Sequence, residues 1–238
     1  MMKTNPTILG IETSTDACSV ALLIGDKIIL RHEIVPREHV QIILSKIDEL
    51  LVEANIELAD CDAIAYGHGP GSFTGLRIAA AMAQGLALGA NLPVIGISSL
   101  RVLAQTGLDE LEVEHRIDYK YILVASDARI QEVYWGCYKA VATELAAPVI
   151  DDQLSAPELV SLPQNVPASN CYGVGNAWYI YKDALEYLSM QLAKIIAVEY
   201  PSAAALVKLA KEAFLQGKLL RPEEAVPVYL RDRVTHSK

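Results

Sequence analysis

Histidine pairs and the short motifs of nucleophilic enzymes are missing from this sequence of 238 residues. The five histidines are His32, His39, His68, His115 and His236, and no two of them are three or four residues apart. Two histidines one helical turn apart hold zinc in many metallohydrolases, so their absence argues against that class. The pattern Gly-x-Ser-x-Gly, which places a serine nucleophile on a sharp turn, is also missing. No metal site and no pair of nucleophile and base are therefore expected.

Cys-x-x-Cys pairs and long hydrophobic runs are absent as well. The four cysteines, Cys18, Cys61, Cys137 and Cys171, are scattered, which favours buried free thiols over a zinc ribbon or a redox dithiol. The longest apolar-rich stretch, residues 76–92, is interrupted by arginine, glutamine and glycine, so no membrane span is expected. The opening MMKTNPT has one lysine and no apolar run, which predicts no signal peptide and a cytoplasmic location.

Acidic residues dominate the chain but are missing from one long segment. The formal net charge is −9, which repels phosphate groups, so nucleic acid is expected to bind only through a partner. Residues 63–108 contain no aspartate or glutamate, and their only formal charges are Arg77 and Arg101. Small residues cover every face of a helix predicted there, which indicates burial on more than one side. Burial within this chain alone and burial of one face against another subunit both stay open.

Hydrophobic periodicity predicts an α/β protein. Strands are expected at residues 8–12, 18–24 and 27–35, with Gly25-Asp26 as a hairpin turn between the last two. Then follow a helix with an apolar stripe from Val40 to Ala54, a strand at 63–66, a helix of small residues at 74–89, a strand at 93–97 and a helix capped by Ser98 or Ser99. The second half begins similarly, with strands at 121–127, 132–138 and 144–150. Two halves that open alike indicate a duplicated α/β unit.

We expect two lobes, residues 1–107 and 108–238. In the second lobe, Ser155-Ala-Pro-Glu158 has the spacing of a capping box and predicts a short helix. A longer helix is expected at 202–216, ended by Gly217, and it is expected to pack back between the lobes. A short strand is expected around residues 226–230.

The most distinctive local feature is a glycine-rich loop between a strand and a helix, Gly67-His-Gly-Pro-Gly-Ser-Phe-Thr-Gly75. Such loops can hold phosphate groups, and the candidates here are Gly69, Gly71, Ser72, Thr74 and Gly75. The known phosphate motifs fit poorly, because a Walker A loop needs Gly-Lys-Ser/Thr and a dinucleotide fingerprint needs an acid after the next strand. The alternative is a tight turn that lets the helix lie close to the sheet.

Two of the predicted strands end in a carboxylate, Glu12 and Asp127. In a duplicated fold such acids can meet across a cleft, as in ATPases that hold a metal-bound nucleotide, so Glu12, Thr13 and Asp127 are candidates for a residual nucleotide cleft. Phosphate-binding hairpins usually carry a glycine beside the acid, and neither turn here has one. Solvated or turn-capping acids are the alternative, which is favoured for Asp127.

Four sequence blocks resemble the TsaB family: Ile8–Ala21, Gly69–Ile78, Ser126–Tyr134 and Pro227–Arg231. They span nearly the whole chain in the expected order, and the Gly-Pro-Gly-Ser-Phe-Thr-Gly block is quite specific. The resemblance implies an actin-like, duplicated ribonuclease-H-like fold. It also implies a non-catalytic subunit without a cofactor, required for transfer of a threonylcarbamoyl group to the adenine next to the anticodon of tRNA.

The resemblance further implies two partners, the related transferase subunit TsaD and the small ATPase TsaE. It implies pairing with TsaD, or with a second copy when the chain is alone, through helices of the first lobe, and contact with tRNA only through the complex. We therefore expect an interface formed by Arg37, His39, Ile43, Ile47, Leu51, Leu76, Ala80 and Ala83. Two less favoured functions stay open: an ATP-dependent phosphotransferase with Asp127 as its base, and a metallopeptidase-like hydrolase.

Overall fold

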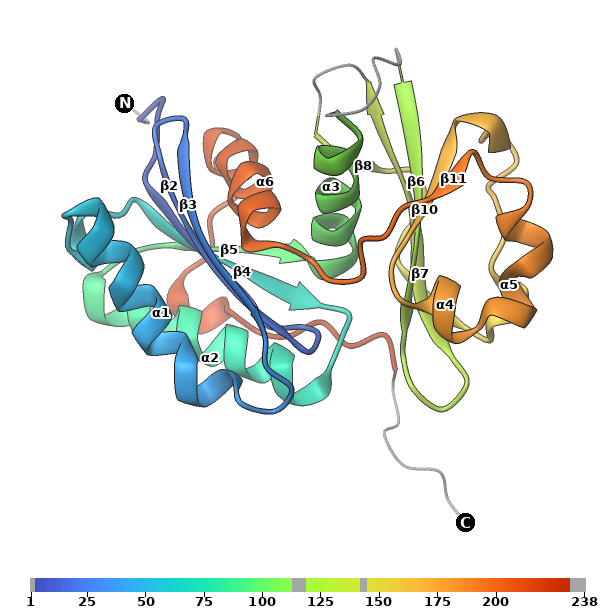
Figure 1. Ribbon diagram of the computed structural model, residues 1–238. Coiled ribbons are helices and arrows are strands. Elements are labelled where there is room, and N and C mark those ends of the chain that lie inside the picture. The colour runs from blue at the N-terminus through green and yellow to red at the C-terminus, as the bar shows by residue number, and fades with distance from the viewer. Residues whose placement is uncertain (1–2, 113–118, 142–144, 232–238) are drawn as a thin grey trace.

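The computed structural model describes residues 3–112, 119–141 and 145–231 of the chain. It contains two α/β lobes, each built around one mixed sheet (Figure 1). Of the helices within these ranges, none has both the length and the hydropathy that crossing a membrane requires.

The first lobe is organised by a five-stranded sheet in the order β3-β2-β1-β4-β5. β1 pairs antiparallel with β2 and parallel with β4, so it lies at the centre of the sheet. The predicted hairpin turn is confirmed, since Ile24 pairs with Lys27 and Gly25 has a positive φ of 62°. The strands are β1 (Ile8–Glu12), β2 (Ala17–Ile24), β3 (Lys27–Ile34), β4 (Ala63–Gly69) and β5 (Val94–Ser98).

Helices cover both faces of this sheet, which explains why every residue of β1 is buried. On one face, α1 (His39–Ala54) and α2 (Phe73–Ala90) form a core with Leu9 and Ile11. The other face packs against α6 (Ala203–Leu215), which also contacts α3 beside the second lobe (Figure 1). The continuous apolar run of β1 therefore contributes side chains to two cores, one on each face of the sheet.

Helix α6 lies close to the sheet and ends where the sequence predicts. Gly10 permits the close approach, because a Cβ at this position would stand 2.6 Å from Val207 Cγ1. Gly217 ends the helix with a positive φ of 71°, and the next N–H, that of Lys218, donates to Ala213 O.

The second lobe repeats the strand order of the first. Its sheet runs β11-β10-β6-β7-β8, with β9 paired to β7, so the first strand of each lobe is central and the next two extend antiparallel to one side. The expected duplicated ribonuclease-H-like fold of the actin-like class is therefore confirmed. The strands are β6 (Tyr119–Asp127), β7 (Val133–Val141), β8 (Ala147–Pro148), β9 (Gln153–Ser155), β10 (Cys171–Val174) and β11 (Lys194–Ile195).

Three predicted elements of the second half are wrong. The strand expected at 144–150 is reduced to Ala147–Pro148, and residue 144 lies outside the described residues. Ser155 belongs to β9, where its Oγ accepts from Trp135 Nε1, so it caps no helix, and a single 3-10 turn at Pro157–Leu159 stands in place of the predicted helix. Residues 226–230 lie outside the strands of the described chain. Two short helices were not predicted from the sequence, α4 (Ala177–Ile180) and α5 (Lys182–Ser189).

Helix α3 (Ser99–Glu112) connects the lobes. Its side chains Leu103 and Leu108 belong to one core with Ile122 and Val124 of β6, and the helix also contacts α6. The predicted division after residue 107 falls inside this helix.

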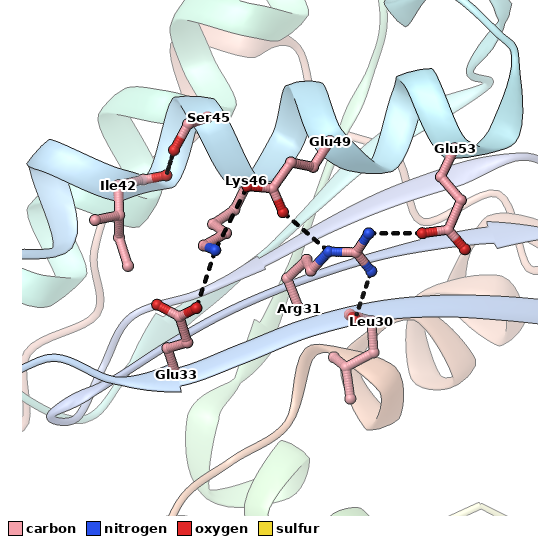
Figure 2. Close-up of polar contacts among 8 residues, drawn as sticks. All are labelled: Leu30, Arg31, Glu33, Ile42, Ser45, Lys46, Glu49 and Glu53. Atoms are coloured by element: carbon pink, nitrogen blue, oxygen red, sulfur yellow. Dashed lines mark hydrogen bonds and ion pairs between the residues drawn. The ribbon is translucent and has the colours of Figure 1, made fainter.

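Ion pairs fasten the outer strand β3 to α1 (Figure 2). Arg31 binds two carboxylates one helical turn apart, Glu49 at 3.0 Å and Glu53 at 2.6 Å, while Lys46 binds Glu33 at 2.9 Å. The two carboxylates raise the pKa of Arg31. Because these groups are solvated and screened by salt, they orient the helix on the strand more than they stabilise the fold. They also charge the edge of the sheet, which discourages pairing with another strand.

Candidate functional site

The glycine-rich loop lies directly on the turn between β1 and β2. Ser72 N–H donates to Ser14 O at 2.7 Å, and Thr13 Oγ1 donates to Gly75 O at 2.8 Å. A Cβ on Gly71 would stand 2.6 Å from Ser14 O, and one on Gly75 would overlap Thr13 O. These glycines therefore allow two turns to pack against each other, which favours the tight-turn interpretation over a phosphate cradle.

Glu12 is enclosed beneath this contact. Its side chain is 1% exposed, with Oε1 accepting from Ser14 N–H at 2.7 Å and Oε2 accepting from Ser99 Oγ at 3.1 Å. Burial raises the pKa of Glu12, although these hydrogen bonds oppose the rise. Thr13 is fully buried. The prediction that Glu12 and Thr13 face a nucleotide is therefore corrected: the glycine loop covers the strand end, and both side chains brace it.

Asp127 caps the turn that follows β6. Its Oδ1 accepts from Arg129 N–H at 2.9 Å and from Tyr181 Oη at 2.8 Å. Its backbone N–H donates to Asn176 Oδ1 at 2.8 Å, and the Arg129 guanidinium lies 3.3 Å from Oδ2. The carboxylate is thus engaged as a turn cap, the role favoured for it from the sequence. Asn176 and Tyr181 belong to segments that the sequence pattern did not reveal.

A cavity of about 330 Å³ lies between the lobes. The cavity is lined by the β1–β2 turn and the glycine-rich loop of the first lobe, the end of β6 in the second lobe, and the C-terminal segment. The lining includes Ser14, Gly71, Phe73, Asp127, Tyr229 and Arg231. Glu12 and Asp127 were expected to meet there. Of the two, Asp127 lines the cavity and Glu12 does not. Across the described ranges, no group of three or more His, Cys, Asp or Glu side chains is placed to hold a metal ion.

Most side chains predicted for a subunit interface are core residues. Ile43, Ile47, Ala80 and Ala83 are at most 4% exposed and join the core that α1 and α2 form with the sheet, and Leu76 is 1% exposed. The correction has a simple cause: the apolar stripe of each helix is the face that its own sheet buries. The other predicted residues differ, since Arg37 is exposed, Leu51 is half-buried, and buried His39 has an Nε2 without a hydrogen-bond partner among the described residues.

A second surface of the same two helices is exposed and consists largely of apolar and small residues. It carries Val40 and Leu44 of α1, which are 58% and 52% exposed. On α2, exposed Ala81, Gly85 and Gly89 recur every four residues. A shallow apolar groove runs between the helices, lined by Val40, Phe73, Thr74, Arg77, Ile78, Ala81 and Met82. The small residues therefore have two faces, one packed on the sheet and one open.

Two lobes of like topology around a shared cavity define this chain as an α/β protein of the actin-like class. A family model described as TsaD, tRNA N6-adenosine threonylcarbamoyltransferase, matches residues 30–238. The tRNA threonylcarbamoyladenosine biosynthesis protein TsaB of Escherichia coli is 37% identical over 231 residues, which are 97% of each chain. The TsaB protein of Haemophilus influenzae is also 37% identical, over 98% of this chain and 97% of its own.

Solved structures show the same likeness. YeaZ from Pseudomonas aeruginosa superposes with a TM-score of 0.82 at 36% identity, over 94% of this chain and all of its own. A second Pseudomonas aeruginosa structure, of an uncharacterized protein with similarity to peptidase YEAZ, has a TM-score of 0.83 at 36% identity, over 95% of this chain and all of its own. The chain belongs to the TsaB family, as its sequence blocks predicted.

Proposed function

We propose that this chain is a non-catalytic subunit in the biosynthesis of threonylcarbamoyladenosine in tRNA, required for transfer of the threonylcarbamoyl group to the adenine next to the anticodon. Its TsaB relatives support the pathway. The non-catalytic role is supported by the engaged acids, since Glu12 is enclosed and Asp127 is held by Arg129 and Tyr181. An ATP-dependent phosphotransferase is disfavoured, because the glycine-rich loop is hydrogen-bonded directly to the β1–β2 turn.

The subunit acts through a TsaD transferase and a TsaE ATPase, and it contacts tRNA within that complex. A net charge of −9 supports this indirect contact, because the isolated chain repels the tRNA backbone. The chain itself matches the TsaD family model over residues 30–238, so two related folds can meet face to face through equivalent helices. When TsaD is absent, the same face joins two copies of the chain.

The observation that carries this interface is the pair of exposed glycines within α2. A Cβ on Gly85 or Gly89 would meet nothing within 4 Å among the described residues, so the packing of this chain does not require glycine there. Glycine within a helix costs about 0.5–1 kcal/mol relative to alanine. A helix of another subunit that crosses close to α2 supplies the missing reason, since small residues let two helix backbones approach. The surrounding segment 63–108 adds no acidic charge to this face.

An omission experiment tests the function. Purified TsaD, TsaE, ATP, the threonylcarbamoyl precursor and unmodified tRNA are mixed with and without this chain. Modified adenosine is measured by mass spectrometry of digested tRNA. We expect modification only when the chain is present. Full modification without it would refute a required subunit.

A charge substitution tests the interface separately. Ala81→Arg places a cation in the exposed groove and should weaken co-elution with TsaD by about tenfold or more, the equivalent of 1.4 kcal/mol. Ala83 is unsuitable for this purpose because it is fully buried. Ala193→Arg, on an exposed turn of the second lobe, is the matched control and should leave co-elution unchanged. Equal co-elution of both variants with TsaD would place the interface elsewhere.

A further inference from the structure

The last described segment of the chain, residues 220–231, is built into the first lobe, and we call it the C-terminal strap. Val228 N–H in this strap donates to His68 O at 2.7 Å, beside the end of β4. Gly69 leaves room for the strap: its φ is 117°, and a Cβ there would stand 2.5 Å from Val228 O. The glycine-rich loop and the strap are therefore fitted to each other.

Tyr229 attaches the strap to the first two turns of α2. Arg77 Nε donates to Tyr229 Oη at 3.0 Å, and the rings of Tyr229 and Phe73 lie 5.5 Å apart between centroids. The Arg77 guanidinium lies over the Phe73 ring, 3.7 Å from its centroid. Phe73 and Tyr229 are 41% and 43% exposed, so water reaches this three-residue contact.

The same three residues stand between two surfaces. Phe73 lines both the outer groove between α1 and α2 and the cavity between the lobes. Arg77 lines the groove, whereas Tyr229 lines the cavity. A side chain that enters the groove therefore meets the two residues that hold Tyr229 on the other side.

Beyond Tyr229, the strap reaches the second lobe. Arg231 forms an ion pair with Glu132 and donates to Arg129 O at 3.5 Å, at the turn between β6 and β7. Three successive residues of this turn, Arg129 to Gln131, have positive φ values of 64°, 55° and 56°. Because β-branched Ile130 rarely adopts such a backbone, the turn depends on the contacts that hold it, and Arg231 adds to the cap that Asp127 provides.

We propose that Phe73, Arg77 and Tyr229 couple occupation of the groove to the C-terminal strap, so that a subunit bound on α1 and α2 tightens the strap and steadies the β6–β7 turn at the cavity. The coupling rests on the proposed function, which places TsaD in the groove. Its direction follows from solvation, because the stacking of a cation on an aromatic ring and its hydrogen bond strengthen when water is removed. Coupling is reciprocal, so a loosened strap weakens subunit binding.

Hydrogen–deuterium exchange of the isolated chain tests the internal link. Arg77→Ala should speed exchange in the strap at Val228, and also in the β6–β7 turn, where Glu132 N–H donates to Arg129 O. Arg31→Ala is the control, because Arg31 of β3 contacts α1 on the side away from the groove. No change in exchange is expected at Val228 or in the β6–β7 turn. Unchanged exchange in the Arg77 variant would overturn the coupling, whether or not a partner binds.

The same measurement in the complex tests the regulation. Binding of TsaD should slow exchange at Val228 by roughly fivefold or more, the lower range of allosteric coupling, and Tyr229→Phe should reduce that protection. A complex that forms without protecting the strap would refute the proposal. Failure of the complex to form on a sizing column would instead refute the proposed function, while the isolated Arg77 variant still decides the internal link.

Discussion

Gly67 lies against the carboxylate of Glu12, so that a Cβ on the glycine would overlap Oε2 and stand 2.6 Å from Glu12 Cδ and 2.8 Å from Ser99 Oγ. This contact joins three parts of the first lobe: the end of β1, the end of β4 and the start of α3. The glycine-rich sequence is thus explained at its first residue by a buried acid. A phosphate ligand is not needed to account for it.

We predict that Gly67→Ala destabilises the protein by about 1–3 kcal/mol, because the new methyl group forces a buried carboxylate to move. The free energy of unfolding in urea measures the change. Gly85→Ala is the matched control, since its Cβ meets nothing within 4 Å in the described chain. In a helix interior this control should gain about 0.5–1 kcal/mol, measured at a protein concentration at which the chain is monomeric. A harmless Gly67→Ala would show that Glu12 has room to rearrange.

We predict that Glu12 makes stability depend on pH. Burial places its folded pKa above the unfolded value, so the folded chain holds a proton that the unfolded chain releases between those two pKa values. The stabilising contribution is complete below the unfolded pKa of about 4.3 and is lost as the pH rises through the folded pKa. Glu12→Gln removes this titration and keeps an acceptor for Ser14 N–H, while its amide N–H donates to Ser99 Oγ, which accepts in place of donating.

Urea unfolding of both proteins at pH 5 and pH 8 tests this sign. The parent chain should lose stability relative to the Gln variant as the pH rises. The free energy of unfolding of the variant minus that of the parent should therefore be more positive at pH 8 than at pH 5. A difference that is equal at both pH values, or larger at pH 5, would contradict a raised pKa for Glu12.

The first lobe could be predicted from the sequence more fully than the second because its signals are long and local. The strand at Ile8–Glu12 and the turn at Gly25 follow from apolar runs and turn residues alone. In the second lobe, β11 has two residues and exists only because Tyr172 and Gly173 lie beside it. Such pairing depends on residues distant in the chain, which a local pattern does not contain.

The candidate site shows the same limit. The sequence identified the strand-end acids and the glycine loop, but it could not show that these features contact each other. Periodicity grouped Ile43 with Ile47 on one face of α1, yet it could not decide whether the sheet or another subunit covers that face. Both side chains are buried against the sheet of this chain. Small residues cover every face of α2, so only the structure shows that Ala81, Gly85 and Gly89 are the exposed ones.

We predict that Tyr138→Phe destabilises the polar cluster at which the two lobes meet. Tyr138 of β7 and Ser98 of β5 both donate to Asp152, the latter at 2.5 Å to Oδ2. Burial raises the pKa of Asp152, so the loss of one donor leaves a costly polar group. The free energy of unfolding should fall by about 1–3 kcal/mol. Tyr187→Phe, at a side chain that is 80% exposed, is the control and should change little. Equal stability of both variants would mean that water replaces the lost hydroxyl.

We predict that the four thiols are inert in the folded protein. All four cysteines are free and buried, and burial raises the pKa of Cys18 and of Cys61 to about 11. The pKa of Cys171 is also raised, by its contact with Cys137 and by burial. At pH 8, three units below such a pKa, about one thiol in a thousand is the reactive thiolate, and it remains out of reach of solvent.

A chromogenic disulfide reagent at pH 8 should therefore release colour only as the chain unfolds, with four equivalents in denaturant. The native rate should follow unfolding measured by circular dichroism across a series of urea concentrations. Gly67→Ala, which weakens the first lobe, should speed the reaction in proportion to its loss of stability, provided that global opening controls access. Rapid reaction of one equivalent in the native chain would contradict this picture and reveal a local opening at a single sheet, since Cys18 and Cys61 lie in the first core and Cys137 and Cys171 in the second lobe.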